Sequence, residues 1–188
     1  MTSIIKANTP SPDTKSGPNA VIPDILTFAV SDFELGKVLV ARSTKGVCAI
    51  LLGNDADGLA ADLASRFQQS TLVHDETAVK GDFAEIKRYV ASPSAGLKLT
   101  LDMRGTPFQR RVWEKLIETA TGRTTTYLEM ARGMTVASHP RAVAGACAAN
   151  PIALAIPCHR VLRTDGTLAG YRWGLERKRI LIEKEMAA

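Results

Sequence analysis

The sequence predicts a mixed α/β (α+β) protein in which a small antiparallel sheet of three strands precedes a mainly helical part. Two observations lead to this prediction. Residues 25–52 contain three short apolar runs separated by turns at Gly36 and at Lys45-Gly46, the pattern of an antiparallel meander. From Arg104 onward, helix-capping motifs and apolar residues at helical spacing replace that pattern. We therefore expect a leader at 1–23, a sheet domain at 24–102 and a helical domain at 103–188.

The leader is rich in proline and small polar residues, so we expect it to be disordered. Apolar residues at helical spacing predict two helices in the sheet domain, at 55–69 and around 83–90. Strands are expected at 25–30, 37–42 and 47–52, and alternation predicts a further short strand at 97–101.

The helical domain opens on a capping box, Thr106 to Gln109, with proline at the first helical position. A second capping box, Thr126 to Glu129, predicts a short helix that ends at Gly133. A third helix follows, with Pro140 in its first turn. Asn150-Pro151 ends it, because asparagine tolerates the left-handed cap and proline cannot continue a helix. A short helix, a turn and a helix in a basic domain resemble a helix-turn-helix.

The charge is distributed unevenly along the chain. The net charge is +5 over 188 residues. Residues 1–103 hold ten Lys and Arg against twelve Asp and Glu, whereas residues 104–188 hold fourteen against seven. A concentrated basic surface suggests a polyanion such as nucleic acid, and a solvated surface rich in arginine explains the same charge equally well. The third helix is built of small residues between Arg141 and Asn150, so we expect any DNA to be bound with little sequence discrimination.

Composition also excludes several classes of protein. No apolar run is long enough to span a bilayer, and the polar N-terminus does not read as a signal peptide, so we expect no membrane partner. The three cysteines are odd in number and widely spaced, which fits neither a disulfide framework nor a zinc pattern. We therefore expect a cytoplasmic protein with no metal.

The run Ile-Pro-Cys-His-Arg-Val at 156–161 holds the strongest chemical signal. In it a thiol, Cys158, stands beside an imidazole, His159, which can draw its proton to give the nucleophilic thiolate. A buried, inert cysteine is the alternative for Cys158 taken alone.

This run, together with Asn150-Pro151, Gly170-Tyr-Arg-Trp-Gly174 and the helix at 106–119, resembles the O6-alkylguanine-DNA alkyltransferase family. The likeness covers roughly 25–188 and is greatest to the C-terminal half of the bacterial Ada adaptive-response protein. It implies a ribonuclease H-like sheet domain and direct repair of DNA, in which a flipped guanine loses its O6-methyl group to Cys158 irreversibly. O4-methylthymine is a further expected substrate.

The resemblance also implies roles for individual residues. His159 acts as a base through a water, and Glu185 orients it. Tyr127 donates its hydroxyl to the guanine, and Val161 accepts from it through a backbone carbonyl. Tyr171 and Arg172 bind the base, with the backbone N–H of Arg172 directed at O6, and Asn150 ties the third helix to the active-site segment. The residues expected to contact DNA are Arg141, which enters the base stack, Ala142 and Arg160.

The expected partner is double-stranded DNA containing O6-alkylguanine, bound by a monomer of bacterial origin without a cofactor. Two other functions are open. One is a damage sensor or regulator that holds DNA without chemistry, which the presence of Cys158 disfavours. The other is a Cys-His hydrolase or peptidase, which leaves the basic half unexplained.

Pocket size is predicted from the register of residues after Cys158. Ala169 and Trp173 are expected to line the loop that closes over the flipped base. Family members that accept bulky alkyl groups tend to have glycine at the position of Trp173 and proline at that of Ala153. An indole at Trp173 therefore predicts that O6-benzylguanine is a poor substrate.

Overall fold

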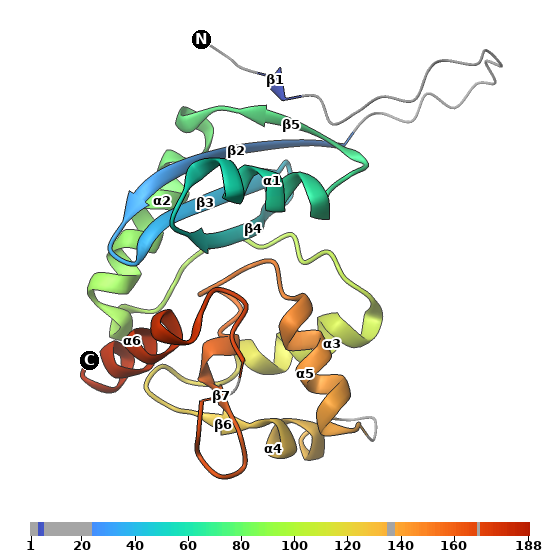
Figure 1. The fold of residues 1–188 in the computed structure, drawn as a ribbon, viewed down its shortest axis with the longest axis vertical. Helices are drawn as coiled ribbons and strands as arrows, with labels where there is room; N and C mark the ends of the chain where they lie inside the picture. The colour runs from blue at the N-terminus through green and yellow to red at the C-terminus, as the bar shows by residue number, and fades with distance from the viewer. Residues whose placement is uncertain (1–3, 6–23, 135–137, 169) are drawn as a thin grey trace, which may run out of the picture.

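The computed structural model describes residues 4–5, 24–134, 138–168 and 170–188. In Figure 1 the sheet and its helices lie above a second, mainly helical layer, with the C-terminal helix between them. The mixed α/β class is thereby confirmed. Most of the leader expected to be disordered lies outside the described residues. The exception is Ile4–Ile5, which forms a short strand, β1.

The three predicted strands are confirmed as an antiparallel meander. They are β2 (Asp24–Phe33), β3 (Gly36–Ser43) and β4 (Gly46–Gly53). Gly36 lies at φ 108°, and a Cβ there would meet the carbonyl oxygen of Gly53 at 2.5 Å, so this turn requires glycine.

The expectation of a three-stranded sheet was wrong, because β5 (Ser70–His74) pairs parallel with β2 and β1 pairs antiparallel with β5. The sheet of the described residues has five strands in the order β1-β5-β2-β3-β4. The segment that forms β5 is too short to show alternation, and its strand conformation depends on pairing with β2, which is distant in the sequence.

Both predicted helices of the sheet domain are confirmed, as α1 (Ala56–Arg66) and α2 (Glu76–Ala91). Asp55 and Asp75 cap them, each accepting from backbone N–H groups of the first turn. Consecutive residues of β3 and β4 are fully buried, which shows that both faces of the sheet are covered there.

The strand predicted at 97–101 does not form. Leu101 makes only an isolated parallel bridge to Val47, and the rest of this segment lies beyond the 3-10 turn η1 (Pro93–Ala95) without strand partners. Alternation alone was misleading here, because a strand also requires continuous pairing with a neighbouring strand, and in this segment only Leu101 pairs with β4.

Both capping boxes of the helical part are confirmed, at the starts of α3 (Pro107–Ile117) and α4 (Tyr127–Arg132). The third predicted helix is α5 (Pro140–Ala149). Asn150 follows it at φ −58°, ψ 120°, so the left-handed cap expected there is wrong. Residues 135–137 of the connection between α4 and α5 lie outside the described residues, and the helix-turn-helix remains a prediction.

After α5 the chain forms a 3-10 turn, η2 (Cys158–Arg160), and the last helix, α6 (Leu175–Met186). A short parallel pair, β6 (Thr125–Thr126) and β7 (Val161–Leu162), joins the segments around them. No helix among the described residues is long and apolar enough to cross a membrane.

The sheet and the helical part are joined by backbone hydrogen bonds. Ile50 of β4 donates to Pro151 and accepts from Ala153, at 3.0 and 2.9 Å. Arg177 of α6 donates to the carbonyl of Leu35, in the turn between β2 and β3, at 2.8 Å. It also donates to the carbonyl of Gly53, the last residue of β4, at 2.9 Å. The segment that leads to Cys158 is therefore held against the edge of the sheet.

Candidate active site

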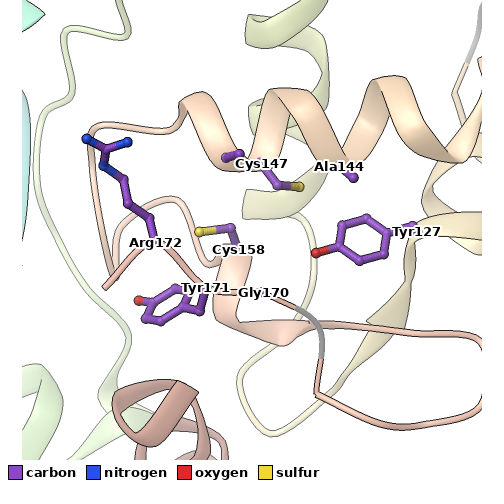
Figure 2. Close-up of a pocket in the computed structure, with 8 residues that line it drawn as sticks. Tyr127, Ala144, Cys147, Cys158, Gly170, Tyr171 and Arg172 are labelled. Atoms are coloured by element: carbon purple, nitrogen blue, oxygen red, sulfur yellow. The ribbon is translucent and has the colours of Figure 1, made fainter. Parts of the chain in front are cut away.

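A pocket of about 510 Å³ opens between α5 and the segment before α6. Figure 2 shows Cys158 in it, with Tyr127 to one side and Tyr171 to the other. Small side chains of α5 form one wall. The full lining is Tyr127, Ala144, Cys147, Ala148, Cys158, Gly170, Tyr171 and Arg172.

The segment before Cys158 is buried and rigidly hydrogen-bonded. Asn150 is fully buried and makes three contacts: its Oδ1 accepts from Ile152 N–H at 2.8 Å, and its Nδ2 donates to the Ile156 carbonyl at 2.9 Å and to Cys158 Sγ at 3.3 Å. The predicted link from α5 to the active-site segment therefore exists. Leu154 lies in the left-handed region at φ 68°, an uncommon conformation for a leucine.

The thiol of Cys158 is protonated at rest. Burial raises its pKa to about 11, and the hydrogen bond from Asn150 opposes that rise. Cys147 lines the same pocket, and burial raises its pKa to about 12. Asn150 donates a hydrogen bond to the sulfur of Cys158, and such a donor stabilises a thiolate.

His159 and Glu185 form a buried pair. His159 Nε2 lies 2.7 Å from Glu185 Oε1, so the proton is assigned to Nε2 and the lone pair to Nδ1. Nδ1 is buried and has no hydrogen-bond partner among the described residues. Burial lowers the pKa of His159, and the contact with Glu185 offsets this only in part. The imidazole is therefore neutral at pH 7 and can accept a proton.

Glu185 is ionised. Burial alone raises its pKa, but hydrogen bonds from His159 and Arg160 outweigh burial and hold that pKa well below its usual range. Arg160 Nε donates to Oε2 at 2.8 Å and Arg160 Nη2 donates to Oε1 at 3.0 Å.

The placement of Arg160 corrects its predicted role. Its side chain is 7% exposed and is bound to Glu185, the Thr119 carbonyl and the Tyr89 hydroxyl, which leaves no donor directed at DNA. A buried arginine paired with a carboxylate cannot be told from a surface arginine by sequence, because the partner lies 25 residues away.

The base-binding residues predicted from the sequence gather at the pocket, with differences in detail. Tyr127 points its hydroxyl toward Cys158 in Figure 2, and burial raises its pKa to about 12. Tyr171 packs edge-on against His159, at 6.4 Å between ring centroids. Arg172 turns its guanidinium away from Cys158 and pairs with Asp62 at 2.7 Å. The Val161 carbonyl already accepts from Lys178 Nζ at 2.5 Å.

Trp173 does not line the pocket. It is 5% exposed, packs T-shaped behind Tyr171 at 5.1 Å, and faces a separate hollow beside α1. The structural basis of the predicted rejection of O6-benzylguanine is therefore wrong. Ala153 is buried in the segment before Cys158, and Ala169 lies outside the described residues.

The predicted DNA contacts on α5 lie on its exposed face. Arg141 and Ala142 are exposed in the first turn, and Gly145 and Ala148 continue that face along the helix. Ala148 also lines the pocket, so this face leads directly to Cys158. Several arginines of the helical part are exposed and make no ion pair with the described acidic residues: Arg110, Arg111, Arg123, Arg132, Arg141 and Arg163.

Two residues of the site were missed by sequence reasoning. The Tyr89 hydroxyl, from α2, donates to Glu185 Oε1 at 2.5 Å, and Lys178 is fully buried against Val161. Neither carries a local signal, because each reads as an ordinary position of an amphipathic helix. The described residues hold no group of three or more His, Cys, Asp or Glu that could bind a metal ion.

Comparison with known proteins connects this site to a family. Residues 107–187 match the family model described as 6-O-methylguanine DNA methyltransferase, DNA binding domain. The chain is 42% identical over 158 residues to the bifunctional transcriptional activator/DNA repair enzyme Ada of Escherichia coli, and the match covers 84% of the chain but only 45% of that relative. It is 34% identical to the methylated-DNA–protein-cysteine methyltransferase of Candida albicans, over 85% of the chain and 96% of that protein.

Solved structures show the same fold. The Mycobacterium tuberculosis protein OGT in complex with DNA is similar with a TM-score of 0.74 and 31% identity, over 86% of this chain and 93% of that one. The O6-methylguanine-DNA methyltransferase of the hyperthermophilic archaeon Pyrococcus kodakaraensis is similar with a TM-score of 0.64 and 26% identity, over 85% of this chain and 98% of that one.

Proposed function

The chain belongs to the O6-methylguanine-DNA methyltransferase family, and from this premise we propose that it repairs DNA directly by moving a methyl group from O6-methylguanine to its own Cys158. The observation that carries the proposal is that Cys158 lines the pocket while buried neighbours support it: Asn150 donates to its sulfur, and His159, the next residue, is bound to Glu185. O4-methylthymine is proposed as a second substrate of the same reaction.

Methyl transfer consumes the thiol. Cys158 Sγ attacks the methyl carbon, the carbon–O6 bond breaks, and its electron pair stays on the guanine. The thiol proton passes through a water to Nδ1 of His159, whose Nε2–H remains bound to Glu185. The guanine takes up a proton as it leaves, and the Tyr127 hydroxyl is the proposed donor. Water then carries the proton held by His159 to the tyrosinate, so both side chains regain their resting states and the thiol proton ends on the guanine. The product is a thioether with no route to hydrolysis, so each molecule acts once.

The neutral resting thiol explains how the site avoids wasteful reactions. With a pKa of about 11, Cys158 is almost entirely protonated at pH 7. Deprotonation is coupled to the presence of an alkylated base in the pocket, and the Asn150 amide stabilises the sulfur as charge develops.

Double-stranded DNA is the proposed partner, bound by a cytoplasmic monomer with little sequence preference. The exposed face of α5, lined by Arg141, Ala142 and small residues, supports close approach to a groove without base-edge reading. The guanine is proposed to flip into the pocket while Arg141 fills the gap in the stack. Tyr171 and Arg172 are proposed to bind the flipped base, with Arg172 acting through its backbone N–H.

The deciding experiment incubates the full chain with duplex DNA that carries one O6-methylguanine and measures intact mass, followed by peptide mapping. We expect one added methyl group per molecule, located on Cys158. Cys158→Ala should take up no methyl group and still bind the duplex, because the α5 face is unchanged. Cys147→Ala is the matched control and should react like the wild type.

The other two functions predict different outcomes. Binding without any mass change would favour a damage sensor or regulator. Sustained turnover of a peptide or ester substrate would favour a Cys-His hydrolase.

A further inference from the structure

Glu185 occupies a position where a carboxylate needs support. It is in the last turn of α6, where the helix dipole disfavours negative charge and where helix ends fray. Its carboxylate nevertheless is 3% exposed and holds His159 at 2.7 Å. Contacts from outside α6 must therefore fix its position.

Those contacts come from three segments. Oε2 accepts from Arg160 Nε at 2.8 Å and from the backbone N–H of Gly122 at 3.4 Å. Oε1, the oxygen that contacts His159, also accepts from Arg160 Nη2 at 3.0 Å and from the Tyr89 hydroxyl at 2.5 Å. Tyr89 belongs to α2, 96 residues away in sequence, and is 2% exposed.

Tyr89 is suited to act as a permanent donor. Burial and the neighbouring Glu185 raise the pKa of its phenol, so it keeps its proton. Its oxygen in turn accepts from Arg160 Nη2 at 3.1 Å, which orients the hydroxyl toward Oε1. The Tyr89 hydroxyl thus donates to Oε1, the same carboxylate oxygen that accepts from His159, and it reduces the negative charge that this oxygen presents to His159.

We infer that Tyr89, supplied by the sheet domain, is a positioning residue for methyl transfer that holds Glu185 and limits how strongly Glu185 binds the proton of His159. This inference rests on the proposed function. The groups that face His159 are Glu185 and Lys178 of α6, Cys158 and Arg160 of η2, and Tyr171; Tyr89 acts through Glu185.

The direction of the effect follows from charge. Without the Tyr89 donor, Oε1 carries more negative charge and stabilises protonated His159 more strongly. The imidazole then becomes protonated at higher pH and loses its function as a base there. The acid side of the rate–pH profile should therefore move to higher pH.

The test measures single-turnover methyl transfer from O6-methylguanine duplex DNA against pH for the wild type and Tyr89→Phe. Phenylalanine keeps the ring and removes only the hydroxyl. We expect the rate of methyl transfer in Tyr89→Phe to fall about three- to tenfold on the acid side of the profile, which is the range that loss of one hydrogen bond gives. The rate on the alkaline plateau should change less. DNA affinity should not change.

Ile86→Val is the matched control. Ile86 lies one turn earlier on α2, is fully buried and has no polar side-chain atom, so its truncation weakens packing without touching Glu185. Its rate–pH profile should keep the wild-type shape. In a Glu185→Gln background, Tyr89→Phe should cause no further displacement of the profile.

A second measurement does not depend on activity. Imidazole nitrogen NMR of the histidine-labelled protein should show His159 protonated on Nε2 in the wild type, and its titration should move to higher pH in Tyr89→Phe but not in Ile86→Val. An unchanged titration, or an equal loss of rate at every pH, would overturn the role of Tyr89. If the wild type takes up no methyl group, the proposed function fails and the NMR titration alone decides the inference.

Discussion

Two thiols, Cys147 and Cys158, line one pocket, and Asn150 donates to the sulfur of Cys158. Asn150 Nδ2 lies 3.3 Å from Cys158 Sγ, and the same side chain satisfies the backbone of Ile152 and Ile156. One buried residue therefore both shapes the segment before Cys158 and donates to the sulfur of the proposed nucleophile. This double role makes Asn150 sensitive to substitution in two separable ways.

Asn150→Ala should lower both stability and rate. It leaves the buried Ile152 N–H without its partner, which costs about 1–3 kcal/mol, and it removes one of the two donors to the Ile156 carbonyl, which still accepts from the Cys158 N–H at 2.8 Å. Methyl transfer should slow at least about tenfold through loss of the donor to sulfur. Urea denaturation and single-turnover kinetics measure the two effects. Cys147→Ala, which removes the neighbouring thiol, should leave the rate intact; a similar loss of rate in that variant would contradict the assignment.

At the scale of single elements, α5 has one buried side and one exposed side, and beyond Arg141 the exposed side carries only small residues. Val143, Ala146 and Cys147 face the interior, whereas Gly145 is exposed and a Cβ added there would meet nothing within 4 Å. Glycine within a helix lowers stability relative to alanine. Gly145 is therefore better explained by a binding partner, proposed to be DNA, that comes close to this face of α5.

Gly145→Gln should fold normally and bind duplex DNA at least about tenfold more weakly, because a long side chain would separate the helix from the groove. Gly81→Gln is the matched control, since Gly81 is also an exposed helical glycine with nothing within 4 Å, on α2. Fluorescence anisotropy with undamaged duplex measures both. Equal affinity of the two variants would show that the exposed face of α5 is not in contact with DNA.

At the scale of the whole molecule, the excess positive charge is confined to the helical half. Fourteen Lys and Arg stand against seven Asp and Glu in residues 104–188. These residues are placed differently. Arg160 is buried and Arg179 is paired with Glu176 and Glu183. Arg163 is exposed, and it is close enough to Tyr127 for its charge to oppose the rise that burial causes in the pKa of that phenol.

Arg163→Ala should reduce the slope of log affinity against log salt by about 0.9, the value for one lost phosphate contact. Arg179→Ala should leave that slope unchanged, because its guanidinium is paired on the exposed side of α6. Titrations of one duplex at several salt concentrations provide the slopes. A change of slope for Arg179→Ala and none for Arg163→Ala would place the DNA on a different face.

Short sequence patterns correctly predicted the elements that depend on residues close together in the chain. The two capping boxes, the meander of β2 to β4 and the end of α5 at Asn150 are confirmed because each depends on residues within a few positions. The run around Cys158 and His159 predicts the proposed chemistry from adjacent residues in the same way. The predicted strand at 97–101 and the missing β5 show the limit, since strand pairing depends on partners far along the chain.

The sequence by itself determined the fold class and the basic half of the chain, and it was sufficient to predict Cys158 and His159 as the proposed nucleophile and base. Only the tertiary structure decided that Arg160 supports Glu185 and not DNA, that Tyr89 of the sheet domain completes this cluster, and that Trp173 lies behind the pocket. The physical reason is that burial and partner choice are set by packing between α2, η2 and α6. The same arginine, tyrosine or tryptophan therefore has no defined role until those elements meet.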